Sequence, residues 1–189
     1  MVKLNKIYTR TGDDGTSGLA DGSRVAKSSL RMTAIGDVDE ANSAIGVART
    51  ALGQGIVEEA LARIQNDLFD LGADIATPLA EGEAPGAALR IVASQVTRLE
   101  QEIDRLNDEL SPLTSFVLPA GDASASALHL ARAIARRAER SAVAATQDAM
   151  LNPLALAYLN RLSDYLFVAA RWVNQAGAGD VLWVPGAQR

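Results

Sequence analysis

The stretch IVEEALARIQNDLFDLGADIA, residues 56–76, predicts the fold class of the chain. Its large apolar residues recur at alternating intervals of four and three positions, at Val57, Leu61, Ile64, Leu68, Leu71 and Ile75. Residues with this spacing lie on one face of an α-helix, whereas a half-buried strand would place apolar residues at every second position. The stretch is therefore predicted to form a long helix that buries one face against other helices.

Four other segments carry the same helical spacing, at about residues 30–52, 89–110, 122–147 and 153–175. The inner face of the 122–147 segment is mostly alanine, which lets a neighbouring helix approach closely. Prolines and glycines between residues 77 and 88 cannot continue a helix and predict a connecting loop. The same apolar seams would also suit a coiled-coil scaffold, which remains the alternative.

These segments predict one all-α domain that covers residues 1–189. Residues 30–176 form a five-helix bundle in this prediction, preceded by a glycine-rich N-terminal loop at 1–28. Residues 177–189 are expected to form a C-terminal tail, because the glycines at 177 and 179 end the last helix.

The composition of the chain restricts its ligands and its chemistry. Its formal net charge is -5, so neither nucleic acid nor an anionic membrane is expected as a partner. The chain has no cysteine, which excludes disulfides, thiolate nucleophiles and Cys-ligated metal sites. No segment approaches 18 consecutive apolar residues, and the N-terminus lacks the apolar run of a signal peptide. We therefore expect a soluble, cytoplasmic protein.

Glycine, hydroxyl and basic residues gather in IYTRTGDDGTSG, residues 7–18. The segment supplies Thr9, Arg10, Thr11, Gly12, Gly15, Thr16, Ser17 and Gly18. Glycines permit positive φ and let backbone N–H groups converge, while the hydroxyls and the guanidinium add donors. This composition suits a phosphate cradle, although neither the GxxxxGK[ST] nor the GxGxxG spacing is present. Because Asp-Gly pairs are common in turns, a purely structural turn is the alternative.

Arginines line one face of the predicted fourth helix, in ARAIARRAER, residues 131–140. Arg132, Arg136 and Arg140 are spaced four apart and therefore stack along that face, with Arg137 and Glu139 beside them. Like charges at this spacing repel one another, so a bound polyanion or the carboxylates of a partner would explain them. A solvated basic face is the alternative.

The predicted fifth helix carries a polar stripe opposite its leucine seam, formed by Asn160, Asp164, Phe167 and Arg171. Asparagine and aspartate lower helix propensity, so other interactions should compensate for them. Asn160 can bond a nucleotide phosphate or sugar, and Asp164 and Arg171 can equally pair with neighbouring side chains.

Two isolated ring residues have structural and functional interpretations. Phe116 lies in the loop SFVLPAG, residues 115–121, where it either joins the core or walls off an apolar ligand. His129 is the only histidine, so no histidine cluster can bind a metal, and we interpret it as structural.

Six motifs in this order resemble those of the ATP:cob(I)alamin adenosyltransferases of the propanediol-utilisation type. They are KIYTRTGDDGT, RVAK, GDVDEANS, FVLPAG, RRAER and NRLSDYLF, and together they span nearly the whole chain. The resemblance implies a five-helix bundle that assembles as a homotrimer with active sites at the subunit interfaces. It also implies transfer of the 5′-deoxyadenosyl group of ATP to the cobalt of cob(I)alamin, with Mg²⁺, and release of triphosphate.

The same resemblance assigns roles to individual residues but assigns no metal ligand. The implied ATP contacts are Thr9, Arg10, Thr11, Gly12, Ser17, Gly18, Lys27, Arg136, Arg137, Glu139, Arg140 and Asn160. Arg136 and Arg140 would also be catalytic, together with Asp39 and Arg132, which would pair across the subunit boundary. Phe116 would lie over the lower face of the corrin and keep the cobalt four-coordinate. Ala41 and Ala120 depart from the leucine and glycine that are usual in these motifs, and Ala120 lies in the loop that carries Phe116.

The resemblance further implies two protein partners, a corrinoid reductase and an adenosylcobalamin-dependent enzyme. A different function for the same motifs is an ATP-gated trimeric carrier that delivers adenosylcobalamin to such an enzyme. A third possible function is that of a helical scaffold whose basic stripe binds another protein. Formation of adenosylcobalamin and triphosphate would distinguish the transferase from both.

Overall fold

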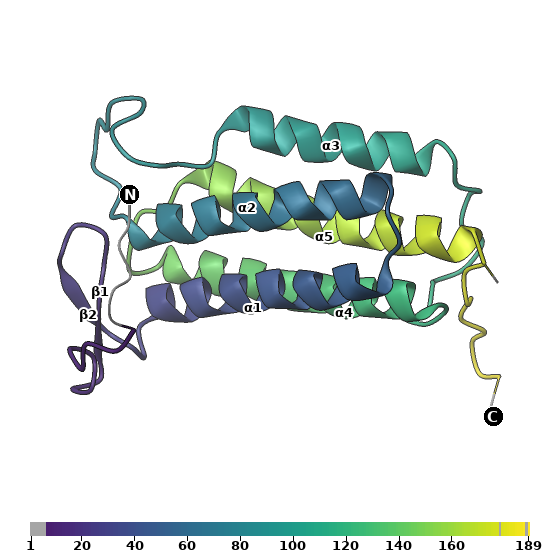
Figure 1. Cartoon of the computed structure of the whole chain (residues 1–189), viewed down its shortest axis with the longest axis horizontal. Helices are drawn as coiled ribbons and strands as arrows, with labels where there is room; N and C mark the ends of the chain where they lie inside the picture. The colour runs from purple at the N-terminus through teal and green to yellow at the C-terminus, as the bar shows by residue number, and fades with distance from the viewer. Residues whose placement is uncertain (1–6, 178, 188) are drawn as a thin grey trace.

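The computed structural model describes residues 7–177, 179–187 and 189 of the chain. Its elements are a short antiparallel hairpin and five helices (Figure 1): β1 Thr16–Gly18, β2 Arg24–Ala26, α1 Leu30–Ala51, α2 Ile56–Ala76, α3 Ala93–Asn107, α4 Ala123–Ala145 and α5 Pro153–Gln175. The predicted all-α five-helix class is confirmed.

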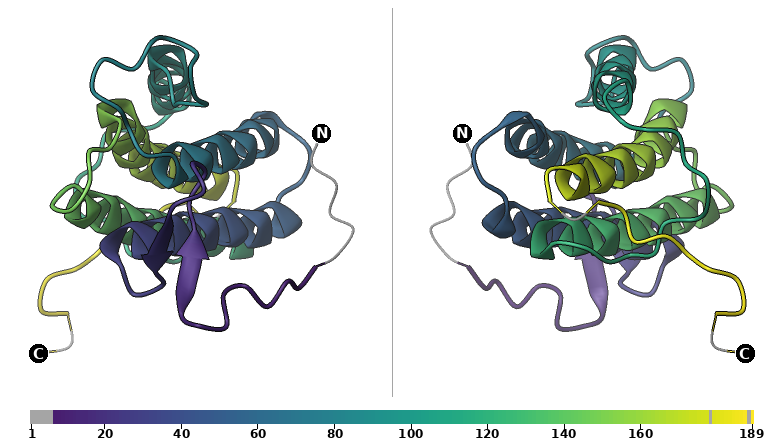
Figure 2. Two further views of the ribbon diagram at one scale, coloured as in Figure 1. Left: turned by 90° about the vertical axis from the view of Figure 1, so that its left-hand side faces the viewer. Right: turned by 90° about the vertical axis from the view of Figure 1, so that its right-hand side faces the viewer.

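The helices pack in a fixed order of neighbours. α1 packs against α4 and α2, and α4 packs against α5, while α3 lies on the outside against α5 (Figure 2). The alanine face of α4 is buried, as predicted: Ala131, Ala138 and Ala142 each have 0% exposure. Small side chains let α1 and α5 approach α4 closely, so the basic residues of α4 are held on a well-packed helix.

The first helix begins at a side-chain cap. The Oγ atom of Ser29 accepts a hydrogen bond from the backbone N–H of Met32 at 3.3 Å. α5 begins in the same way, because Asn152 Oδ1 accepts from the N–H of Leu154 at 3.0 Å, and Pro153 occupies the first turn as predicted. The sequence therefore fixes where both helices start.

α3 is shorter than predicted, because it begins at Ala93 rather than near Leu89. The N–H of Ile91 donates to Asp74 Oδ2 at 2.8 Å, and the guanidinium of Arg90 pairs with Asp74 Oδ1 at 2.8 Å. These two residues are bound to the end of α2 and cannot join the first turn of α3.

A second buried carboxylate joins α2, α3 and α5. Asp67 on α2 accepts hydrogen bonds from Tyr158 Oη at 2.8 Å and Gln95 Nε2 at 2.9 Å, and pairs with Arg98. Burial, with the nearby Asp67 charge, raises the pKa of Tyr158 above its ordinary value. The phenol therefore remains a donor, which keeps the buried carboxylate satisfied.

The hairpin and the C-terminal tail lie at opposite ends of the bundle. Figure 1 shows the hairpin beside the start of α1, whereas the tail and the segment between α3 and α4 lie at the other end. The N–H of Ala20, between the two strands, donates to the carbonyl of Ala76 at 3.0 Å and fixes the hairpin to the end of α2. Among the residues that the structure describes, none of the helices has the length and hydropathy needed to span a bilayer.

Candidate functional site

The N-terminal segment folds around the guanidinium of Arg24. In the hairpin, Ser17 pairs with Val25 and Gly18 with Arg24. Arg24 Nε donates to Thr16 Oγ1 at 2.8 Å, and its Nη2 donates to the carbonyl of Thr11 at 2.6 Å. The sequence assigned no role to Arg24 itself. It holds the backbone of the glycine-rich loop against β1.

Gly12 and Lys27, two of the predicted ATP contacts, come together in this loop. A Cβ atom added to Gly12 would lie 3.1 Å from the Nζ atom of Lys27 and 3.1 Å from the carbonyl oxygen of Thr16. The backbone N–H of Lys27 donates to the carbonyl of Gly15 at 2.9 Å. A side chain at position 12 would therefore be in tight contact with the end of Lys27 and with the backbone of Thr16, and the ammonium or the loop would have to shift slightly.

The residues just before Gly12 are exposed and carry further donors. Arg10 adopts a left-handed backbone conformation with φ of 63°, and its guanidinium lies 5.7 Å from the ring centre of Tyr8. The hydroxyls of Thr9 and Thr11 are 2.8 Å apart. A non-glycine residue at positive φ is uncommon and marks a conformation that its surroundings impose.

Arg136 and Arg140 lie exposed on α4, as their spacing predicted. Arg140 Nη1 donates to the carbonyl of Arg136 at 3.0 Å, one turn earlier inside α4, and forms no ion pair with a carboxylate among the described residues. Arg132 is partly buried, and its Nε atom has no hydrogen-bond partner within the described part of the chain. Burial and the positive charge of Arg136 lower the pKa of Arg132. One face of α4 therefore carries positive charge that an anionic ligand would neutralise.

Arg137 points in a different direction from Arg136 and Arg140. It pairs with Asp37 at 3.4 Å and also with Glu40, both on α1. Its hydrogen bond to Glu40 raises the pKa of Arg137, and Ser141 Oγ donates to Asp37 Oδ2 at 2.5 Å. The structure thus places Arg137 in the α1–α4 contact of one subunit rather than in the row formed by the other arginines.

Glu139 and Asn160, which the sequence also placed at the nucleotide, lie side by side on α4 and α5. Asn160 Nδ2 donates to Glu139 Oε1 at 2.8 Å, and Arg161 Nη1 donates to Asn160 Oδ1 at 2.5 Å. Within residues 7–177, 179–187 and 189, no three acidic or histidine side chains gather closely enough to hold a metal ion.

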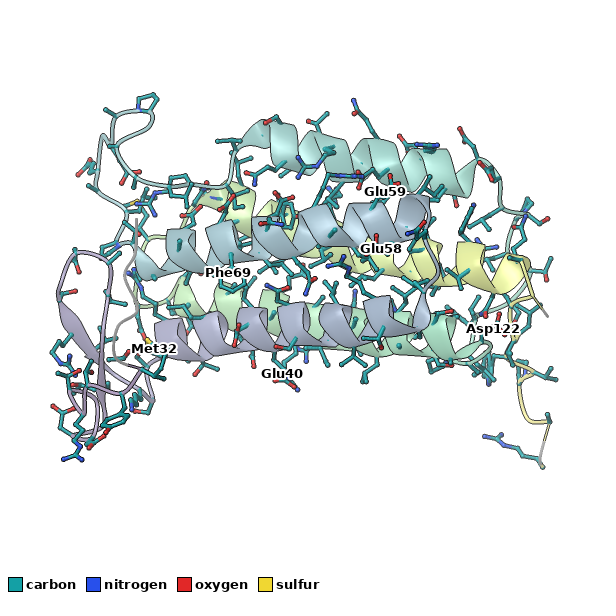
Figure 3. The ribbon with its side chains drawn as sticks, viewed as in Figure 1. Met32, Glu40, Glu58, Glu59, Phe69 and Asp122 are labelled. Carbon is teal, nitrogen blue, oxygen red and sulfur yellow. The ribbon has the colours of Figure 1, made fainter. Side chains whose placement is uncertain are left out.

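Asp39 borders a mostly apolar hollow of about 480 Å³ between α1 and α2. Met32 and Phe69 also line it, and Figure 3 labels both on the same side of the molecule. Phe69 is 73% exposed although it is a large aromatic residue. The sequence analysis missed both side chains. The available signal was that Phe69 falls outside the apolar seam of its helix, where an aromatic residue has no packing role within the subunit.

Phe116 lies at the end of the bundle that is remote from the hairpin. Its side chain is 77% exposed and its ring centre is 5.9 Å from that of Trp183 in the tail. α4 alone contains 23 residues and is therefore about 34 Å long. One chain does not bring Phe116 to the glycine-rich loop, so a site that contains both needs a second subunit.

His129 is buried, with 2% exposure, as a structural histidine would be. Its ring centre lies 6.3 Å from that of Phe167, and both ring nitrogens lack a hydrogen-bond partner among the described residues. Burial is the main cause that lowers the pKa of His129, with the nearby Arg132 charge adding to it. The lowered pKa favours the neutral imidazole.

The ammonium of Lys27 lies beside the glycine-rich loop, and Arg136 and Arg140 on α4 form no ion pair among the described residues, so both parts of the molecule suit an anionic ligand. Residues 7–173 match the sequence model of the cobalamin adenosyltransferase family. The chain belongs to this family.

Relatives in distant organisms agree with this assignment. A corrinoid adenosyltransferase of Mycobacterium tuberculosis is 52% identical over 193 aligned residues, which cover 100% of this chain and 97% of the relative. The cobalamin adenosyltransferase of Cupriavidus metallidurans is 49% identical, with 96% and 95% coverage. A variant of the PduO-type ATP:corrinoid adenosyltransferase of Lactobacillus reuteri, complexed with cobalamin and ATP, superposes with a TM-score of 0.87 at 35% identity. That superposition covers 94% of this chain and 99% of that chain.

Proposed function

We infer that the protein transfers the 5′-deoxyadenosyl group of ATP to the cobalt of cob(I)alamin, forming adenosylcobalamin and triphosphate. The observation that carries this inference is the family match over residues 7–173. The transfer forms a cobalt–carbon bond with the electron pair of Co(I) and breaks the bond between C5′ and the triphosphate oxygen. No proton has to be removed from the nucleophile, which fits a chain without cysteine whose one histidine is buried.

The protein has two tasks in this reaction: to hold C5′ over the cobalt and to stabilise the negative charge that develops on the leaving triphosphate. Lys27 supports the second task, because its ammonium lies beside Gly12 of the glycine-rich loop. Arg136 and Arg140 support it from α4, where both are exposed. We assign Asn160 and Glu139 to the nucleotide because of the motifs in which they lie, and their mutual hydrogen bond holds the two side chains together beside this face.

A magnesium ion would enter this site with the triphosphate. Mg²⁺ commonly keeps several waters and is held by one or two carboxylates together with substrate phosphates. Glu139 is the carboxylate within the arginine motif and would be the protein ligand of such an ion. Among the described residues no cluster of three or more acidic or histidine side chains is present to hold the ion by protein ligands alone. When bound, the ion supplies positive charge to the phosphate oxygens.

We propose that the protein works as a homotrimer whose active sites lie between subunits. Two observations support a shared site. The hairpin and the Phe116 segment lie at opposite ends of one chain (Figure 1). Among the described residues, neither the guanidinium of Arg132 nor the exposed carboxylate of Asp39 has an ion-pair partner, so an ion pair between subunits would neutralise both charges.

We place the corrin against the α1–α2 hollow of one subunit, with Phe116 supplied by its neighbour. The lining of the hollow is mostly apolar, and Phe69 adds an exposed ring at its edge. A corrin is a flat macrocycle with a largely apolar face, so burial of these side chains favours its binding. Phe116 would occupy the position of the lower ligand of cobalt, which eases reduction to Co(I) because a donating ligand favours the higher oxidation state.

The direct test is a product assay. The protein, ATP, Mg²⁺ and chemically reduced cobalamin should give adenosylcobalamin, followed by its absorption spectrum, and an equal amount of triphosphate. A carrier that only binds and delivers adenosylcobalamin would form neither product. Formation of adenosylcobalamin without triphosphate would contradict the proposed bond cleavage.

The proposed chemistry also indicates which enzymes supply the substrate of this protein and use its product. Co(I) must be supplied by a corrinoid reductase, and adenosylcobalamin must be passed to an enzyme that depends on it. We propose a cytoplasmic location, where ATP is abundant, and neither nucleic acid nor membrane as a partner, in line with the net charge of -5.

Phe116→Ala tests the steric account of the lower cobalt face. With ATP and Co(II) cobalamin bound, the variant should lose most of the four-coordinate Co(II) population, measured by electron paramagnetic resonance, because a methyl group cannot fill the position of the lower ligand. Leu118→Ala is the matched control, since Leu118 is a less exposed apolar residue of the same loop. A spectrum like that of the unaltered protein would refute the role of Phe116.

Asp39 and Arg132 provide a test of the contact between subunits. Asp39→Ala and Arg132→Ala should each lower kcat/KM by at least about tenfold, because each leaves a charge without its partner and loosens the reacting geometry. The exchange of charges, Asp39→Arg with Arg132→Asp, should recover part of the activity. If the loss of kcat/KM in the double exchange equals the losses of Asp39→Arg and Arg132→Asp multiplied together, the two residues are not coupled and do not meet.

A further inference from the structure

The last turn of α5 holds the segment between α3 and α4 at both of its ends. Asn174 Oδ1 accepts from the N–H of Asp122 at 3.0 Å, and Asn174 Nδ2 donates to the carbonyl of Ala120 at 3.1 Å. At the other end, Gln175 Nε2 donates to the carbonyl of Glu109 at 3.1 Å. Gly121 has a φ of 113°, and a Cβ there would lie 2.1 Å from Asn174 Oδ1, so the turn fits only glycine.

Arg171 joins this segment to the tail. Its side chain is only 8% exposed and forms an ion pair with Asp180 at 2.8 Å through Nε. Its Nη2 donates to the carbonyl of Ser111 at 2.8 Å. Removal of the carboxylate would leave a buried guanidinium without a counter-charge, which is strongly unfavourable. Arg171 therefore fixes Asp180 of the tail to Ser111, near the start of the segment that carries Phe116.

Beyond Asp180, the tail runs alongside that segment. Val117 and Leu182 form an antiparallel bridge. The N–H of Trp183 donates to the carbonyl of Phe116 at 2.8 Å, and Ser115 Oγ donates to the carbonyl of Trp183 at 2.6 Å. The rings of Phe116 and Trp183 are in tilted contact. These contacts hold the backbone of Phe116 from one side, while its side chain stays exposed.

We infer that the Arg171–Asp180 ion pair positions Phe116 for the corrin, by holding the tail against the segment that bears it. This inference rests on the proposed function, since it assigns positioning residues to the cobalamin half of that site. Arg171 and Asp180 need not touch a substrate. Release of the tail would leave Phe116 on a loop that is fixed at its two ends and free at its middle, so the ring would no longer occupy one position over the cobalt.

Asp180→Asn is the variant that tests the ion pair, with Asp180→Glu as the conservative variant and Asp148→Asn as the control. Asp148 is an exposed residue after α4. We expect Asp180→Asn to lower kcat/KM for cobalamin about 10- to 100-fold. The four-coordinate Co(II) signal should fall with it, whereas the increase in Tm produced by ATP should remain. Asp180→Glu should recover part of both losses.

Tail release can also be measured without cobalamin. The chain has two tryptophans, so Trp172→Phe leaves Trp183 as the single fluorescent indole. In this background Asp180→Asn should increase quenching of Trp183 by acrylamide, because the indole leaves the Phe116 segment. Asp148→Asn should not.

The outcomes separate this inference from the proposed function. Unchanged quenching, or an unchanged four-coordinate signal in Asp180→Asn, would overturn the positioning role while the unaltered protein still makes adenosylcobalamin. Loss of the ATP-dependent Tm increase together with the Co(II) signal would also overturn it, because the damage would then be general. If the unaltered protein itself forms no adenosylcobalamin, the proposed function fails and the quenching result still reports on the ion pair.

Discussion

Arg136→Ala should lower kcat for adenosylcobalamin formation by about 100- to 1,000-fold, the usual loss when one preorganised donor to a developing oxyanion is removed. The residue is exposed on α4 and lies one turn from Arg140, whose guanidinium bonds the carbonyl of Arg136. Positive charge already present at this position stabilises the triphosphate as its bond to C5′ breaks. Alanine keeps the helix, because it is the strongest helix former, so the fold should be unaffected.

The distribution of the loss between kcat and KM distinguishes catalysis from binding. A guanidinium that acts mainly on the leaving group lowers kcat with a smaller change in KM for ATP, whereas one that binds ATP and the transition state equally raises only KM. Arg136→Lys should retain part of kcat, since the ammonium keeps the charge but loses the bidentate geometry. Steady-state kinetics at saturating cobalamin measure both quantities.

Arg105→Ala is the matched control for Arg136→Ala. Arg105 is an exposed arginine near the end of α3, remote from the arginine motif in sequence. Its loss should leave kcat within about twofold, as expected for a surface substitution outside the site. Equal kinetics for the two variants would refute the role assigned to Arg136.

The apolar spacing predicted the helices because it depends on residues three and four positions apart, which a single sequence displays directly. The start of α3 could not be predicted in this way. Arg90 and Ile91 are held by Asp74, which lies 16 and 17 positions earlier. The helical pattern of residues 89–92 is therefore overridden by a contact that only the folded chain forms.

The same limit applies to the candidate site. Spacing placed Arg136 and Arg140 on one face of α4, and the structure agrees. It could not show that Arg137 turns to Asp37 on α1, because that partner is remote in sequence. Spacing also could not show that the Phe116 segment and the glycine-rich loop lie at opposite ends of one subunit. Because of this separation, the proposed chemistry needs a site between subunits.

Asp74→Ala should lower the free energy of unfolding by about 2–4 kcal/mol, because a buried carboxylate and its hydrogen bonds are lost while Arg90 keeps its ion pair with Glu83. Asp74 is 2% exposed. It accepts from Arg90 Nη1 at 2.8 Å, from the N–H of Ile91 at 2.8 Å and from Asn152 Nδ2 at 2.7 Å. Alanine would leave a largely buried guanidinium without this carboxylate and a buried N–H without an acceptor.

Asp70→Ala is the control for Asp74→Ala, because Asp70 is a more exposed aspartate near the end of the same helix. Its replacement should change the free energy of unfolding by less than about 0.5 kcal/mol. Denaturant unfolding at one fixed protein concentration measures both variants, since subunit assembly makes stability depend on concentration. Equal stabilities would contradict the importance of the Asp74 contacts.

The position of the Asp74 contacts also predicts where the structure opens. Asp74 lies near the end of α2 and binds the segment before α3 and Asn152 at the start of α5, so it joins three helix ends at the same end of the bundle as the hairpin. Its loss should increase amide hydrogen exchange in residues 89–96 before it does so in α4, whose alanine face is packed independently. The hairpin, held to Ala76 by one backbone hydrogen bond, should loosen with it. ATP affinity should therefore fall in Asp74→Ala even though no substrate contact has been removed.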